Sequence, residues 1–170
     1  MIINRFCRTD FSSYEDFCAN FKITVPEGFN FAFDVFDEIA KDNPDKTALV
    51  WCNDKGEERK FTFSEMSALS AQTANMLKEC GVKKGDVVMT VLRSRFEYWI
   101  AALGVHKLGA VLLPATYQLT EKDFAYRFEA ANVKVLIAVA DPAMTANIDS
   151  AEKKTGRKLV KLCTGGQASE

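Results

Sequence analysis

Several features that mark secreted, metal-binding and membrane proteins are scarce or missing in this 170-residue sequence. Its five cysteines are odd in number, widely separated and never spaced as Cys-x-x-Cys, which argues against a disulfide framework or a zinc site. No apolar run approaches the roughly 20 residues of a membrane-spanning helix, and the N-terminus lacks a hydrophobic signal core. We therefore expect a cytoplasmic protein without a membrane span.

An excess of charge of either sign is also missing. The 22 basic and 23 acidic side chains leave a net charge of -1. This balance gives no electrostatic footprint for nucleic acid or an anionic membrane, so we expect neither as a partner. The sequence has no Gly-x-Gly-x-x-Gly fingerprint, no Walker loop and no Gly-x-Ser-x-Gly elbow. The residues alone therefore nominate no catalytic group and no metal ligands.

The composition does support one folded domain. With 48% hydrophobic and 11% aromatic residues, a chain of this length buries roughly 70% of its unfolded surface. Residues 1–28 are predicted to form an N-terminal arm with a short helix around 13–20, closed by turn residues. Residues 29–163 are predicted to form the α/β domain, and residues 164–170, which lack an apolar face, a flexible tail.

The first half of the domain is predicted to combine helices with a hairpin. Phe29, Phe33, Phe36 and Ala40 recur at helical spacing, which predicts an amphipathic helix with its phenylalanines in the core. Runs at 47–52 and 59–63 are typical of strands, and the polar residues between them suit a turn. Two tryptophans, Trp51 and Trp99, are also expected to pack in the core.

Strands and helices then alternate to the end of the chain. Buried strands are predicted at 87–92 and 110–114, and two further strands at 133–139 and 158–163. Their helices have local start and stop signals: Thr62 with Glu65, Ser94, Thr120 with Asp123, and Asp141-Pro142 at the starts, and Gly81, Gly109 and Gly156 at the stops. Right-handed crossovers should turn this order into a mostly parallel sheet with helices on both faces. The predicted fold class is therefore α/β.

Ligands of open parallel sheets bind beyond the carboxyl ends of the strands, here the loops 93–95, 114–120 and 140–141. Arg93 and Arg95 stand where a predicted helix begins, so a phosphate is one interpretation. The alternative, which we weight about three to one, is that both arginines are solvated or paired with acids such as Glu97. His106, the only histidine, has no neighbouring nucleophile and is expected to have a structural or surface role.

The loop after Pro114 contains Thr116, Tyr117 and Gln118 on a rigid base at the edge of the sheet. The Gln118 amide both donates and accepts hydrogen bonds, which suits an adenine, a pantetheine amide or a backbone group. A purely structural loop, with Thr120 as the helix cap, is about as well supported by the residues.

Seven separated motifs, in the same order along the chain, resemble the medium-chain acyl-CoA synthetases of the adenylate-forming superfamily. They lie at residues 29–37, 53–58, 61–66, 85–88, 97–99, 109–111 and 118–120. Phe96 departs from the pattern, since close relatives tend to have proline there.

The resemblance implies a ligase that uses ATP, CoA and Mg²⁺. A carboxylic acid, expected to be a medium-chain fatty acid or a related acid, becomes an acyl-adenylate with release of pyrophosphate, and CoA then displaces AMP. By position, Gln118 matches a family residue that approaches CoA. The phosphate loop, the magnesium motif and the catalytic lysine of the family lie downstream of the residues present. The resemblance therefore implies an N-terminal part that is inactive alone and binds no cofactor tightly, with a homodimer possible through the surface that truncation exposes.

Two other classes of function remain open. One is a stand-alone, flavodoxin-like module that binds CoA or a similar small ligand through the loop after Pro114. The other is a signalling receiver, which needs an acidic cluster and a lysine at the strand ends. Asp141 is the one acid at such a place, which argues against the receiver.

Overall fold

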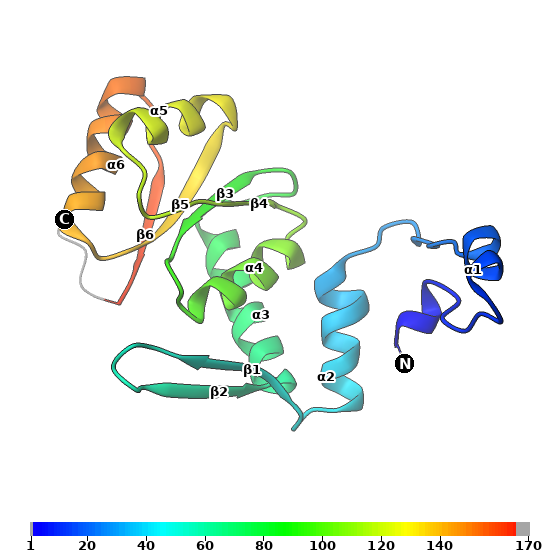
Figure 1. Cartoon of the computed structure of the whole chain (residues 1–170). Helices are drawn as coiled ribbons and strands as arrows, with labels where there is room; N and C mark the ends of the chain where they lie inside the picture. The colour runs from blue at the N-terminus through cyan, green and yellow to red at the C-terminus, as the bar shows by residue number, and fades with distance from the viewer. Residues whose placement is uncertain (1, 166–170) are drawn as a thin grey trace.

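A parallel four-stranded sheet forms the centre of the protein in the computed structural model, which describes residues 2–165 (Figure 1). The sheet order is β4-β3-β5-β6. Its strands are β3 (Val87–Val91), β4 (Val111–Pro114), β5 (Val133–Val139) and β6 (Val160–Thr164). The four predicted strands are therefore confirmed, with small shifts at their ends.

Helices cover both faces of this sheet, and the alternation of side chains along β3 explains why. Val88 packs in one core cluster, and the neighbouring Met89 packs in another. The first cluster joins the sheet to α3 (Phe63–Glu79) and α4 (Glu97–Lys107). The second joins it to α5 (Glu121–Ala130) and α6 (Pro142–Thr155). The predicted fold class is confirmed.

Most helix ends lie where local capping signals predicted them. Thr62 with Glu65 and Thr120 with Asp123 both form reciprocal capping boxes. Asp141 caps α6 through a hydrogen bond from the Met144 N–H (3.0 Å), with a proline in the first turn of the helix. These three helices begin at signals read from the sequence.

The predicted hairpin is a separate antiparallel pair, β1 (Thr47–Cys52) and β2 (Glu58–Thr62). It lies beside α3 and α4 in Figure 1. A third core cluster around Ala32, Met66, Ile100 and Leu103 includes partly buried side chains of both hairpin strands. The hairpin is thus attached to the α3–α4 side of the domain.

The predicted amphipathic helix is present, but its first part is a π-helix, η2 (Ala32–Asp37), followed by α2 (Glu38–Asp42). The prediction that its phenylalanines are core residues is wrong for Phe29 and Phe33, which are 37% and 47% exposed. Ala32 is fully buried instead. Because a π-helix bonds i to i+5, it rotates the buried face of η2 away from the spacing of an α-helix, which exposes Phe33; Phe29 lies before this helix.

Two further core predictions are wrong. Strand β4 lies at an edge of the sheet, so Val111 is half-exposed rather than buried. Trp99 is 54% exposed because α4 turns its small residues toward α3. A Cβ on Gly104 would lie 2.9 Å from the Thr73 methyl carbon, so this close helix approach requires glycine.

The N-terminal arm comprises η1 (Ile2–Arg5) and α1 (Tyr14–Asn20), which confirms the predicted short helix. Phe11, Phe17 and Phe21 pack on one another within the arm. An ion pair from Arg5 to Glu38 (3.0 Å) ties the arm to α2. Residues 166–170 of the predicted tail lie outside the described residues. Within residues 2–165, no helix has the length and apolar composition needed to cross a bilayer.

Candidate functional site

The three predicted ligand loops lie together at the carboxyl edge of the sheet, because β4, β3 and β5 are adjacent and parallel. Strand β3 comes first in sequence and has β4 on one side and β5 on the other. The order of connections therefore reverses between β3 and β5, which is the topological switch point of an open α/β sheet. Loop 93–95 stands at this point, between loops 114–120 and 140–141.

Arg93 joins the other two loops. Its guanidinium donates a hydrogen bond to the Asp141 carboxylate (2.9 Å) and lies over the ring of Tyr117, with Cζ 4.6 Å from the ring centroid. Asp141 and Tyr117 belong to loops on opposite sides of β3. One side chain therefore spans the switch point.

Arg95 is paired with a nearby acid. Its guanidinium donates two hydrogen bonds to the Glu97 carboxylate, which also accepts one from the Thr164 hydroxyl (3.0 Å). Burial raises the pKa of Glu97, but hydrogen bonds from Arg95, the backbone and Thr164 outweigh it, so the net shift of the pKa is downward. Both arginines of the loop are thus neutralised by acids, as the favoured alternative to a phosphate site predicted.

The expectation that Ser94 caps α4 is wrong. The helix begins at Glu97, and its N-cap residue is Phe96, which makes no side-chain cap. The Ser94 carbonyl instead accepts a hydrogen bond from the indole N–H of Trp51 (2.6 Å). This contact ties the loop to the hairpin, and Arg93 beside it has a left-handed backbone, so the helix starts later than the cap signal indicated.

Gln118 is exposed on the loop after β4. Its backbone N–H points to the Thr116 hydroxyl at 3.4 Å, and its side chain makes no hydrogen bond to another residue in the described part of the chain. The next residue, Leu119, is buried in the core with Phe124. The amide of Gln118 is therefore presented to solvent from a loop with one end anchored.

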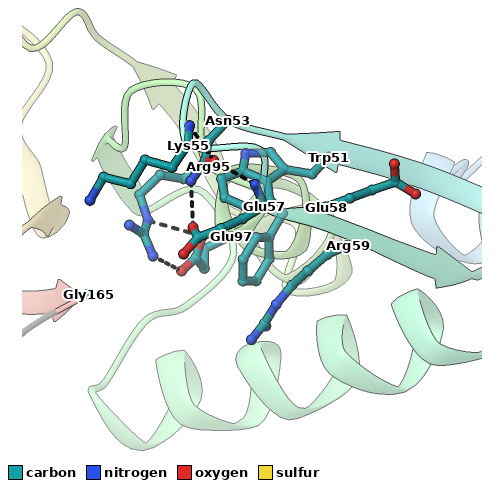
Figure 2. Close-up of a pocket in the computed structure, with 10 residues that line it drawn as sticks. Trp51, Asn53, Lys55, Glu57, Glu58, Arg59, Arg95, Glu97 and Gly165 are labelled. Carbon is teal, nitrogen blue, oxygen red and sulfur yellow. Dashed lines mark hydrogen bonds and ion pairs between the residues drawn. The ribbon is translucent and has the colours of Figure 1, made fainter.

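A cavity of about 640 Å³ lies between the hairpin and the start of α4 (Figure 2). Its wall includes the Phe96 ring, against which Trp51 packs edge-on and Arg59 stacks at 4.9 Å. Figure 2 shows the Arg95 guanidinium directed at Glu97 beside this cavity. Arg95 and Glu97 form an ion pair within its lining, and Gln118 is not among the residues that line it.

A second cavity of about 200 Å³ lies at the switch point itself. Its wall includes Arg93, Arg95, Asp141 and Thr164. Residues 2–165 contain no group of three or more His, Cys, Asp or Glu side chains placed to hold a metal ion.

His106 lies in the last turn of α4, where its backbone carbonyl accepts a hydrogen bond from the Asn30 side chain (2.6 Å). This contact joins α4 to the start of the η2 segment. The contact involves the backbone of His106 alone, so the structural or surface role expected for its side chain stays a prediction. Sequence reasoning did not identify Tyr117 and Asp141 as partners of Arg93, since no local pattern links residues so far apart.

The sheet order, the helices on both faces and the loops gathered at the switch point define a doubly wound α/β domain. Solved structures share it: an anthranilate CoA ligase, AuaEII, matches with a TM-score of 0.72 and 26% identity over 85% of this chain and 27% of its own. A benzoate CoA ligase from Burkholderia xenovorans LB400 matches with a TM-score of 0.66 and 26% identity over 78% and 26%. The fold is that of adenylate-forming enzyme domains.

The sequence comparisons identify the family. The model of the family described as AMP-binding enzyme matches residues 36–169. The acyl-coenzyme A synthetase ACSM3, mitochondrial, of Homo sapiens is 37% identical over 159 residues. The ACSM4 protein of Rattus norvegicus is 39% identical over 125 residues, which are 70% of this chain and 22% of its own. This chain belongs to the AMP-binding enzyme family.

The match covers most of this chain but a small part of its relatives. The alignment with human ACSM3 includes 89% of this chain and 27% of that protein. The mouse ACSM3 alignment includes 95% and 28%. The chain thus spans about a quarter of the length of the curated relatives that it matches.

Proposed function

We propose that this chain forms the N-terminal part of an AMP-forming acyl-CoA synthetase. The observation that carries the proposal is the 37% identity to an acyl-coenzyme A synthetase over 89% of the chain. The shared α/β fold and the order of the seven motifs support the same conclusion. The substrate class that we propose is a medium-chain fatty acid or a related carboxylic acid.

The proposed reaction has two steps. A carboxylate oxygen attacks the α-phosphate of ATP, the bond to the β-phosphate breaks, and pyrophosphate leaves. The CoA sulfur then attacks the acyl carbonyl carbon, and AMP leaves with the bonding electrons. Positioning and charge neutralisation supply most of the catalysis in such group transfers. We assign no step through magnesium to this chain, because its described residues contain no group of three or more His, Cys, Asp or Glu side chains placed to hold a metal ion.

We propose that this chain contributes a contact to CoA as CoA approaches the site. Gln118 is exposed at the carboxyl edge of the sheet, and its amide suits either a pantetheine amide or the adenine ring. The adjacent core residue Leu119 holds one end of its loop. We assign no catalytic residue to the chain, and we propose that the 170 residues alone neither turn over substrate nor bind cofactor tightly.

A chimera tests the proposed function. Residues 36–169 would replace the matching segment of the human relative described above, and acyl-CoA formation would be measured with ATP, CoA, Mg²⁺ and a panel of acids. The expected result is measurable acyl-CoA formation. A chimera that melts cooperatively yet forms neither pyrophosphate nor acyl-CoA would contradict the proposal.

The alternative is a stand-alone module that binds CoA, and the exposed Gln118 on its anchored loop is the observation that favours it. Calorimetric titration of CoA into the 170-residue chain separates the two. Micromolar affinity favours the module, and absence of measurable heat favours a segment whose ligand site needs further elements. The cytoplasmic location and the homodimer remain predictions, and the relatives named above are described as mitochondrial.

A further inference from the structure

We propose that Arg93 is a positioning residue, which fixes the loop carrying Gln118 by joining three strand-end loops across the switch point of the sheet. The inference rests on the proposed function in one respect, since it takes Gln118 to be the contact for CoA. The structural part of the inference, the fixing of the loop, stands on the contacts of Arg93 alone.

The backbone of Arg93 is the first observation. Its φ of 52° lies in the left-handed region, which few residues other than glycine adopt. Among the described residues, one other non-glycine residue, Asn132, has a positive φ, and asparagine is enriched there. Arginine has no such preference, and strained conformations persist where surrounding contacts fix them, often at functional sites.

The side chain of Arg93 supplies the contacts that offset this strain. On one side it is paired with Asp141, whose other carboxylate oxygen accepts the N–H of Met144 at the start of α6. The ion pair is therefore anchored on a helix whose buried face packs in the core. On the other side, the guanidinium lies over Tyr117.

Tyr117 and Leu119 flank Gln118 directly. Leu119 is held by the core, and Tyr117 lies under the guanidinium of Arg93. The position of Gln118 is therefore fixed on one side by the buried Leu119 side chain and on the other by the contact of Tyr117 with Arg93. Without the guanidinium, only the buried Leu119 would hold this loop.

Three variants of the ¹⁵N-labelled 170-residue chain separate the contributions. Arg93→Gly removes the guanidinium and tolerates the left-handed backbone. Asp141→Asn removes the charge of the ion pair and still caps α6. Arg93→Lys keeps the charge but loses the planar stack on Tyr117.

The matched control is Arg8→Gly. Arg8 also combines an ion pair, to Asp16 at 2.9 Å, with a stack on an aromatic ring, Phe11 at 4.7 Å. It lies in the N-terminal arm. It therefore reports what the loss of such an arginine does elsewhere in the chain.

The primary measurement is the backbone order parameter of Gln118 without ligand. The expected value is about 0.85 in the wild type and in Arg8→Gly, and below about 0.6 in Arg93→Gly. Asp141→Asn and Arg93→Lys should fall between these values, and 1 M NaCl should lower the wild-type value, because salt screens exposed ion pairs. An unchanged order parameter in both Arg93→Gly and Asp141→Asn would overturn the inference.

A titration with CoA, followed by the amide resonances, separates this inference from the proposed function. In the wild type, CoA at millimolar concentration should shift the Gln118 resonance, a weak contact that differs from the micromolar binding of a stand-alone module, and Arg93→Gly should need about three- to tenfold more CoA for the same shift. Equal affinities would overturn the inference. If CoA shifts nothing in the wild type, the proposed CoA contact fails, and the order parameters still decide whether Arg93 fixes the loop.

Discussion

Gln118, which we propose contacts CoA, differs from the two residues that follow it because its side chain neither packs in the core nor makes a hydrogen bond to another described residue. Its side chain is exposed, whereas Leu119 contributes to the core and Thr120 caps α5. A change of this side chain should therefore leave the loop folded. Substitution of Gln118 therefore separates binding from stability.

We predict that Gln118→Ala weakens the CoA-dependent shift of the loop resonances by about three- to tenfold, the loss of a single hydrogen bond to a ligand. The melting temperature should stay the same. The matched control is Gln72→Ala, which removes another exposed glutamine amide, on α3. An equal loss of binding in the two variants would contradict the role of Gln118.

Sequence reasoning at the scale of single residues succeeded where the signal was local. The Thr62 and Thr120 capping boxes involve residues three apart, so the pattern itself names both partners. Arg93 and Asp141 are 48 residues apart, and the sheet order alone brings them together. The sequence therefore predicted that Arg93 pairs with an acid, but it did not identify Asp141 as that acid.

At the scale of elements, the first strand of the parallel sheet is tied to its neighbour by charge as well as by backbone hydrogen bonds. The Lys134 ammonium at the start of β5 donates to the Asp86 carboxylate just before β3 (2.7 Å), and the Lys83 N–H donates to the same carboxylate. The hydrogen bond from Lys134 and the one from the Lys83 backbone lower the pKa of Asp86 below its usual value of 3.8. The folded state therefore favours the charged form.

This lowered pKa sets the direction of a pH dependence. A carboxyl group with a lower pKa in the folded state stabilises the protein above its unfolded pKa and loses this effect as the pH falls through the folded value. We predict that the wild type melts at a higher temperature than Asp86→Asn at pH 7 and that the difference shrinks below pH 3.8. The control is Asp54→Asn, which removes one exposed carboxylate on the hairpin turn. A difference independent of pH would exclude the electrostatic explanation.

The elements that sequence reasoning misjudged share a physical reason. Alternation and helical spacing report whether one face of an element is apolar, but not which strand lies at an edge or which helix changes its pitch. The half-exposed Val111 on β4 follows from sheet order, and the exposed Phe33 follows from the π-helical ladder of η2. The sheet order depends on contacts distant in sequence, and the spacing of apolar residues does not show which helical pitch the backbone adopts.

At the scale of the whole molecule, the arm and the α/β domain differ in how they are held. Figure 1 shows α1 on the far side of α2 from the sheet. The ties between arm and domain include the exposed ion pair of Arg5 with Glu38 and the edge-to-face pair of Phe6 with Phe29. The predicted boundaries after residues 28 and 163 have not been tested.

Removal of residues 2–28 tests the first boundary. We predict a cooperative melt within about 4 °C of the full chain, because an aromatic pair contributes about 1 kcal/mol and the core lies outside the arm. Circular dichroism during heating measures this transition. Loss of the cooperative transition would place the arm inside the folding unit.

We propose that these residues form one side of an acyl-CoA synthetase site and depend on further elements for the chemistry. The most direct measurement is AMP release by the purified 170-residue chain with ATP, CoA, Mg²⁺ and a panel of medium-chain acids, beside the active chimera as a positive control. The account predicts AMP release at the level of the protein-free blank. Acid-dependent AMP release with formation of acyl-CoA by the chain alone would contradict it.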